Sequence, residues 1–123
     1  VEKVQIIDSL FYGCTSNSNG GALHLQDIPL VTIQRSRFIA NRAKLRGGAI
    51  YDLCNRETCK IDFTAENKVR FVGNMAEISG GAIHWFGSAT PSLDISRVYL
   101  KANEAYYGNE LSSEPVSLMA VTT

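Results

Sequence analysis

The sequence predicts an all-β fold: a parallel β-helix, or solenoid, of about four coils with three short strands in each coil. Three observations carry this prediction: a motif that repeats along the chain, apolar residues that alternate with a period of two before each copy, and no helical stretch between copies. The motif is Phe, Asn three residues later, Ala two residues further, and Gly-Gly-Ala-Ile beginning six residues after the Asn. It is complete at 38–50 and at 71–83.

Two weaker copies extend the repeat over nearly all of the 123 residues. The first position of the motif holds Phe11, Phe38, Phe71 and Leu100, at steps of 27, 33 and 29 residues. Short strands that recur at this interval predict coils stacked about 4.8 Å apart. We therefore expect one β-helix segment over 1–123, with a tail at 112–123 that holds one more strand after Pro115. The start, VEKVQIIDSLF, lies within the strand pattern without a secretory signal, which favours a mature form or a fragment of a longer chain.

Each coil is expected to have a strand at an apolar pair, a strand at the Phe position and a strand at Ala-Ile. The apolar pairs are Val4 and Ile6, Val31 and Ile33, Ile61 and Phe63, and Leu93 and Ile95. In the third coil, three extra residues at 65–67 separate the pair from Phe71. The Phe position and the column Leu23, Ile50, Ile83 and Leu111 are expected to point inward, each side chain contributing about 2 kcal/mol of burial.

The polar and small columns predict the turns between strands. Asn41, Asn74 and Asn103 form a column whose stacked amides bond to the coils on either side, and Cys14 ends this ladder in the first coil. Paired glycines supply a bend that needs positive φ or a close backbone approach: Gly20, Gly21, Gly47, Gly48, Gly80 and Gly81. Two residues after the Phe position, all residues are small, as a tight corner requires: Gly13, Ala40, Gly73 and Ala102.

A leucine-rich repeat is the alternative fold, because Ile95, Val98, Leu100 and Asn103 fit its LxxLxLxxN core. Against it, the half of each repeat after Asn carries Gly-Gly and a new apolar strand.

The three cysteines divide into a close pair and a single residue. Cys54 and Cys59 are separated by four residues inside an apparent insertion, which suits a small disulfide loop and an oxidising compartment. Two free thiols in a loop are the alternative. No metal site is expected, since His24 and His84 lack zinc-ligand spacing with these cysteines.

The FxxN and GGAI pair resembles the repeats of the polymorphic outer membrane proteins of chlamydiae and of related surface proteins in protists. Two copies match fully, and the last copy, NEAYYGNELSSEP, is similar to the ends of such repeat arrays. The resemblance covers about residues 1–115. It implies a right-handed parallel β-helix displayed outside the cell, often as an adhesin or coat component.

Two outward stripes are the expected contact surfaces. His24, Tyr51 and His84 follow the inward Leu/Ile column, and with Trp85 and Phe86 they form either an aromatic face for sugars or partners or a stripe that shields the sheet. The second stripe is basic, and it is either a glycan-binding face or a solvated surface. Its members are Arg35, Arg37, Lys68, Arg70 and Arg97.

No catalytic or cofactor-binding residue is expected. The acidic residues, including Asp52 and Glu77, read as solvated surface, and the chain carries no P-loop, nucleophile elbow or HExxH motif. Formal net charge is zero, which gives no support for nucleic-acid binding, and no apolar run approaches the roughly 20 residues that span a bilayer.

These features together predict a non-catalytic structural or adhesive segment at the cell surface or outside the cell. Its partners would be protein segments stacked on the coil ends and glycans, with any membrane contact made by another part of the parent protein. A polysaccharide-acting enzyme fragment and a leucine-rich-repeat binding module are the alternative functions.

Overall fold

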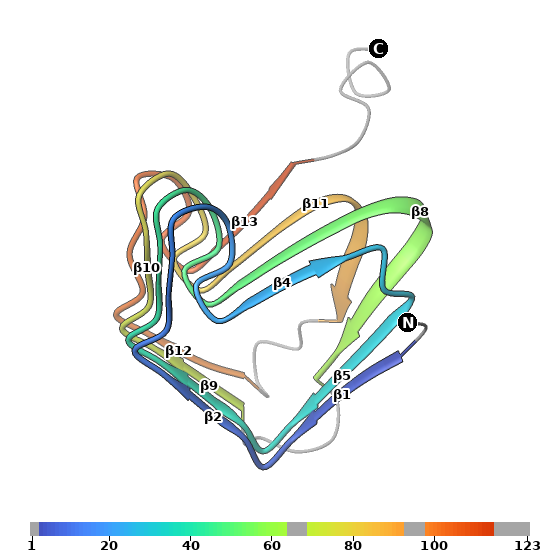
Figure 1. Ribbon diagram of the computed structural model, residues 1–123, viewed down its shortest axis with the longest axis horizontal. Helices are drawn as coiled ribbons and strands as arrows, with labels where there is room; N and C mark the ends of the chain where they lie inside the picture. Colours follow the sequence, from blue (N-terminus) through green and yellow to red (C-terminus); the bar gives the residue numbers. More distant parts are fainter. Residues whose placement is uncertain (1–2, 64–68, 93–97, 115–123) are drawn as a thin grey trace.

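The computed structural model describes residues 3–63, 69–92 and 98–114, and its thirteen regular elements are all strands. Every strand pair is parallel, and the strands form three sheets that wrap round one axis (Figure 1). The chain is therefore a parallel β-solenoid, as the sequence predicts.

Each coil contributes one strand to the four-stranded sheet, so this sheet gives the number of coils. It has the order β12-β9-β6-β2 and consists of β2 (Leu10–Tyr12), β6 (Arg37–Ile39), β9 (Val69–Val72) and β12 (Val98–Lys101). Phe11 lies opposite Phe38, Phe38 opposite Phe71, and Phe71 opposite Leu100. Four passes through this sheet correspond to three full turns of the chain.

The largest sheet forms two walls of the solenoid. Its strands are β1 (Lys3–Ile7), β4 (Leu23–Gln26), β5 (Leu30–Gln34), β8 (Ile50–Asp62), β11 (Ile83–Ser92) and β13 (Leu111–Glu114). β8 and β11 bend from one wall into the other, whereas in the first coil β4 and β5 are separate strands (Figure 1). The expected tail at 112–123 thus begins inside β13, and the strand expected after Pro115 lies outside the described residues.

A small third sheet was not anticipated. It consists of two-residue strands directly after the ladder column: β3 (Thr15–Ser16), β7 (Arg42–Ala43) and β10 (Met75–Ala76). Each of the first three coils therefore has one more short strand than the three predicted. The half of the coil after Asn is built from strands and glycine bends, so the leucine-rich-repeat alternative does not describe this fold.

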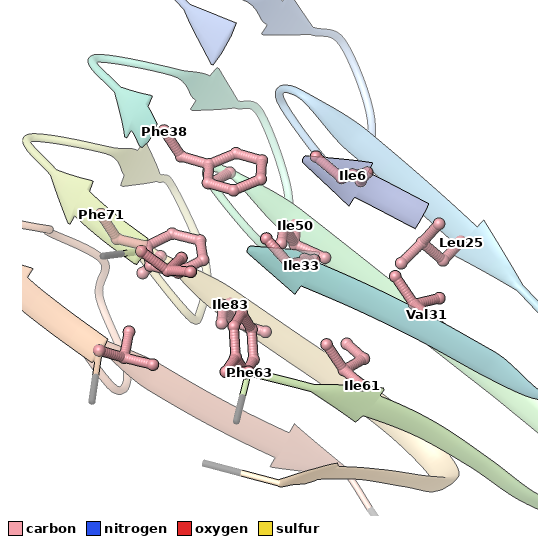
Figure 2. Close-up of a cluster of buried hydrophobic side chains, with 14 residues drawn as sticks. Ile6, Leu25, Val31, Ile33, Phe38, Ile50, Ile61, Phe63, Phe71 and Ile83 are labelled. Atoms are coloured by element: carbon pink, nitrogen blue, oxygen red, sulfur yellow. The ribbon is translucent and has the colours of Figure 1, made fainter. Parts of the chain in front are cut away.

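The core is a stack of equivalent side chains from successive coils. The rings of Phe11 and Phe38 lie parallel with centroids 4.8 Å apart, and those of Phe38 and Phe71 lie 4.7 Å apart. Figure 2 shows the aliphatic columns beside this stack. Ile50, Ile83 and Phe71 are fully buried, which confirms the two predicted inward columns.

The two glycines of each bend meet two backbone requirements, and the first glycine meets both: a Cβ at Gly47 would lie 2.2 Å from the carbonyl oxygen of Ile50. Gly47 has φ +71°, a conformation that glycine adopts at low cost. Gly48 is needed for space: a Cβ there would lie 2.1 Å from the carbonyl oxygen of Gly81 in the next coil. The pairs at 20–21 and 80–81 repeat both features, so positive φ and close approach are both required.

The column of small residues two positions after Phe is explained by backbone conformation. Gly13, Ala40, Gly73 and Ala102 all have φ between +55° and +67°. A Cβ at Gly13 or Gly73 would meet no atom within 4 Å, so crowding, the reason expected from the sequence, is not the cause.

Ala40→Gly is expected to stabilise the fold by about 0.5–1 kcal/mol, because an L-residue at positive φ costs about 1–2 kcal/mol and glycine's greater unfolded-state freedom offsets part of the gain. Ala43→Gly in strand β7 is the matched control and is expected to destabilise, since Ala43 is buried in a regular strand. Urea unfolding measures both, and destabilisation by Ala40→Gly would contradict the assignment.

Candidate functional site

The Asn column forms the hydrogen-bonded ladder that the sequence predicts. Asn41 Nδ2 donates to Asn74 Oδ1 at 2.9 Å, and Asn74 Nδ2 donates to Asn103 Oδ1 at 2.8 Å. Each amide oxygen also accepts the backbone N–H of the preceding coil's ladder residue, and each Nδ2 also donates to a carbonyl of the preceding coil, such as Phe38 O. All three Asn residues are buried, so their role is structural.

Cys14 ends the ladder at the first coil, as expected. Its backbone N–H donates to Asn41 Oδ1 at 2.9 Å, which needs no particular side chain at position 14. Cys14 is a free, half-buried cysteine.

The fourth coil closes the other end of the ladder with its own side chains. In the third coil, Asn74 Nδ2 bonds to the next Asn, and Ala76 N–H bonds to Glu104 O in the coil above. In the fourth coil, Glu110 Oε2 accepts the hydrogen bond from Asn103 Nδ2, and Asn109 Oδ1 accepts that from the Ala105 N–H. Asn109 and Glu110 stand where earlier coils have Gly and Ala, so the degenerate fourth motif caps the Asn ladder.

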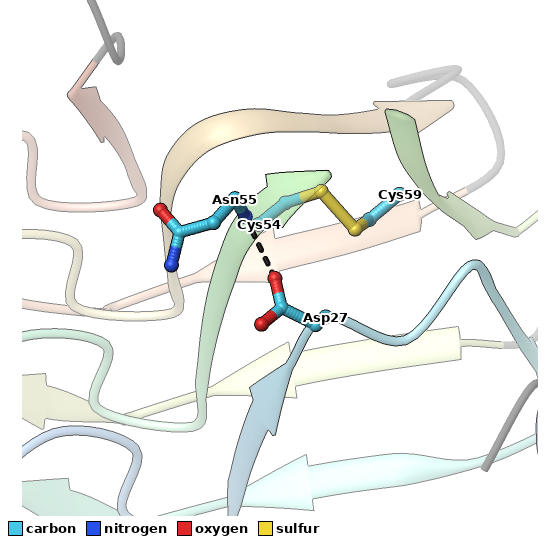
Figure 3. The surroundings of a disulfide bond; sticks show 4 residues. All are labelled: Asp27, Cys54, Asn55 and Cys59. Atoms are coloured by element: carbon cyan, nitrogen blue, oxygen red, sulfur yellow. Dashed lines mark hydrogen bonds between the residues drawn. A yellow bond between two sulfur atoms is a disulfide. The ribbon is translucent and has the colours of Figure 1, made fainter. Parts of the chain in front are cut away.

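The disulfide predicted between Cys54 and Cys59 is present, with an S–S distance of 2.02 Å. Cys54 pairs with Gly87 of β11, and Cys59 pairs with Ala89 two residues later. The four residues between the cysteines therefore bulge out of β8 opposite one residue of β11, and the disulfide joins the two ends of this bulge (Figure 3).

Asp27 lies beside the disulfide on the turn after β4. Its Oδ1 accepts the Asn55 N–H at 2.7 Å (Figure 3). One carboxylate oxygen and both sulfur atoms lie within 4.8 Å of one another. Because the two sulfurs are bonded to each other, these residues form a structural clip in this state.

The aromatic stripe was expected to face outward, and this is wrong for two of its members. His24 is exposed, but Tyr51 and His84 are buried, and the Tyr51 and His84 rings stack with centroids 5.6 Å apart. The turn before the paired glycines covers His84: Ser79 Oγ lies 3.0 Å from His84 Nδ1, as does Ser112 Oγ from the next coil. Tyr51 and His84 therefore form a second internal layer on this side of the sheet, while His24 stays exposed.

Trp85 and Phe86 extend the strand but do not form an open aromatic face. Both are half-buried, and Trp85 packs against the core and the disulfide.

Asp52 was expected on the surface and instead lies inside the solenoid. It occupies the same column as Leu25 and Trp85, its exposed fraction is 1%, and neither carboxylate oxygen has a hydrogen-bond partner. Burial and, secondarily, the charge of Asp27 raise the pKa of Asp52 to about 7. Strict alternation from Ile50 would have placed it inward, but its charge favoured the surface prediction.

The residues of the predicted basic stripe lie in different surroundings. Arg35 forms a two-pronged ion pair with Asp8, with distances of 2.7 and 3.2 Å. This pair lowers the pKa of Asp8, chiefly through the hydrogen bond. Arg37 and Arg70 are exposed and adjacent in register, while Lys68 and Arg97 lie outside the described residues.

The outer face of the four-stranded sheet contains these two arginines and further residues that the sequence analysis did not single out. We define the outer B face as the positions directly before and after the Phe column: Leu10, Tyr12, Arg37, Ile39, Arg70, Val72, Tyr99 and Lys101. Leu10, Tyr12 and Tyr99 are 53%, 69% and 46% exposed. Alternation about the Phe column would have identified them, since residues on either side of an inward residue point outward.

A separate open hollow of about 310 Å³ lies beside the three-stranded sheet. Arg42, Lys44 and Glu77 contribute charges of both signs to its lining, together with Thr15, Ser16 and Asn17. This mixed lining favours no single class of ligand.

No family model, curated protein or solved structure matches this chain. Among the described residues, no helix is long and apolar enough to cross a membrane.

Proposed function

We propose that the chain is a non-catalytic structural and adhesive segment of an extracellular or cell-surface protein assembly. It binds partners through its outer sheet faces and its open ends, and any membrane attachment belongs to another part of the parent protein. The observation that carries the proposal is the outer B face, on which Leu10, Tyr12 and Tyr99 are largely exposed beside cationic side chains. Exposed aromatic and arginine side chains that gather on one face are typical of interaction surfaces.

Three further features support this proposal. The Cys54–Cys59 disulfide suits an oxidising compartment. The FxxN and GGAI motifs resemble repeats of surface proteins. Both ends of the solenoid leave sheet edges, β1 and β2 at the first coil and β12 and β13 at the fourth, with no strand beyond them among the described residues.

Two groupings that resemble catalytic arrangements are enclosed within this fold. The Ser79–His84 contact has the composition of a nucleophile and base, but both residues are buried, with exposed fractions of 4% and 0%. The charge of Asp27 helps to raise the pKa of Asp52, but the Asp52 carboxyl group is enclosed in the core, where a sugar chain does not reach it. This placement favours the scaffold over a polysaccharide-acting enzyme.

Beads coated with the folded protein are expected to adhere to monolayers of cultured epithelial cells, while beads coated with the reduced, heat-unfolded protein detach under flow. A parallel assay would measure reducing ends after incubation with a panel of neutral and acidic polysaccharides. Release of sugar above the blank, or detachment of both bead types, would overturn the proposal.

A further inference from the structure

The outer B face concentrates positive charge without acidic residues. Its eight positions include Arg37, Arg70 and Lys101, all exposed, and none of the eight is Asp or Glu. The whole chain has formal net charge zero, so this face differs from the average of the molecule.

Arg37 and Arg70 lie one above the other, an arrangement that electrostatic repulsion between their charges disfavours. Arg37 lies directly opposite Arg70 in the sheet, at the strand spacing of about 4.8 Å. Like charges at this position cost energy unless a counter-charge lies nearby. Arg70 turns toward Tyr99, with its guanidinium carbon 5.3 Å from the ring centroid, which holds the cation on the face.

The Arg35–Asp8 ion pair, at the corner before β6, differs from the arginines of the outer B face. Arg35, at the turn before β6, is bonded to the Asp8 carboxylate of the adjacent coil. Charge there is neutralised within the chain, whereas in the described part of the chain no acidic side chain forms an ion pair with Arg37, Arg70 or Lys101.

We propose that the outer B face binds an acidic polysaccharide, with Arg37, Arg70 and Lys101 on its anionic groups and Tyr12 and Tyr99 against its sugar rings. Three successive strands of the face, β6, β9 and β12, each carry one cation, so positive charge continues along the solenoid axis, which suits a polymer with repeating negative charges. The apolar positions Leu10 and Ile39 add surface that a ring can cover. This inference rests on the proposed adhesive function and names its ligand class.

Retention on a heparin column at low salt, with elution by rising salt, is the test. Arg37→Ser/Arg70→Ser is expected to weaken heparin binding at least tenfold and to flatten its salt dependence, while Lys101→Ser has a smaller effect. The matched control is Arg42→Ser/Lys44→Ser, which removes the same charge beside the three-stranded sheet and is expected to keep wild-type retention. Circular dichroism confirms that each variant is folded.

Each other outcome decides against the proposal. Wild-type retention of the Arg37→Ser/Arg70→Ser variant, or equal losses in both double variants, would overturn the assignment to this face. Stronger retention on a single-stranded DNA column than on heparin would indicate a nucleic acid in place of a glycan. If the wild type fails to bind heparin while its beads still adhere to cells, this inference fails and the adhesive function stands.

Discussion

Replacing Asn74 with alanine is expected to destabilise the protein by about 4 kcal/mol. Asn74 makes four buried side-chain hydrogen bonds: its Oδ1 accepts from the Asn41 backbone and from Asn41 Nδ2, and its Nδ2 donates to Phe38 O and Asn103 Oδ1. Alanine removes the acceptor of the Asn41 N–H and a donor to Phe38 O, whereas Asn41 Nδ2 keeps Phe11 O and Asn103 Oδ1 keeps the backbone N–H of residue 74. Each buried group that stays unsatisfied costs about 1–3 kcal/mol. Guanidinium chloride unfolding at pH 6 measures the loss.

Cys14→Ala is the control in the same column. The Cys14 side chain takes no part in the ladder, because its backbone N–H makes the bond to Asn41 Oδ1, so the expected cost is below about 1 kcal/mol. Similar losses in the two variants would show that the amide bonds add little to packing at this column.

The stability of the wild-type protein is expected to fall as pH rises from about 4 to about 7, because Asp52 is buried without a partner. The pKa of Asp52 is raised from 3.8 to about 7 in the folded state, chiefly by burial and then by the charge of Asp27. Since the folded state holds the proton more tightly, folding is favoured below the unfolded pKa, and the advantage is lost through the folded pKa. A pKa difference of this size corresponds to about 4 kcal/mol.

Asp52→Asn removes this titration with little change in side-chain shape. Urea unfolding at pH 5, 6, 7 and 8 is expected to show declining stability in the wild type and a nearly flat profile in the variant. Asp27→Asn is the companion variant: it removes the second cause of the shift and so lowers the folded pKa of Asp52, and the decline should end at lower pH and be smaller. Parallel profiles for wild type and Asp52→Asn would contradict the burial of a neutral carboxyl group.

The sequence was most informative where one position recurs in every coil. Phe38 and Phe71, or Asn41 and Asn74, must lie over one another once the chain coils, so the columns predicted the core, the ladder and the glycine bends. The spacing of Cys54 and Cys59 was enough to predict the disulfide, because the two cysteines lie at the ends of one short bulge.

Sequence reasoning failed where one part of a coil covers another part. Alternation gives the side of the strand on which His84 lies, but nothing in the repeat shows that the turn containing Ser79 folds over that side. Asp52 was misplaced for the opposite reason: alternation and the aligned Leu25 both indicated the interior, and the general cost of burying a charge outweighed them. A raised pKa resolves this conflict, because the buried group is neutral over part of the pH range.

The ladder cap at the fourth coil makes the two ends of the solenoid different, and this determines where an extra coil can be added. Gly48 accommodates its successor only because it lacks a Cβ, whereas Asn109 and Glu110 project side chains at the corresponding step. A longer version engineered by duplicating one repeat would therefore tolerate the extra copy between existing coils, for example after residue 45, and would reject it when appended to the capped end. In this architecture an added coil is accommodated between existing coils, and the fourth coil keeps its place at the capped end of the ladder.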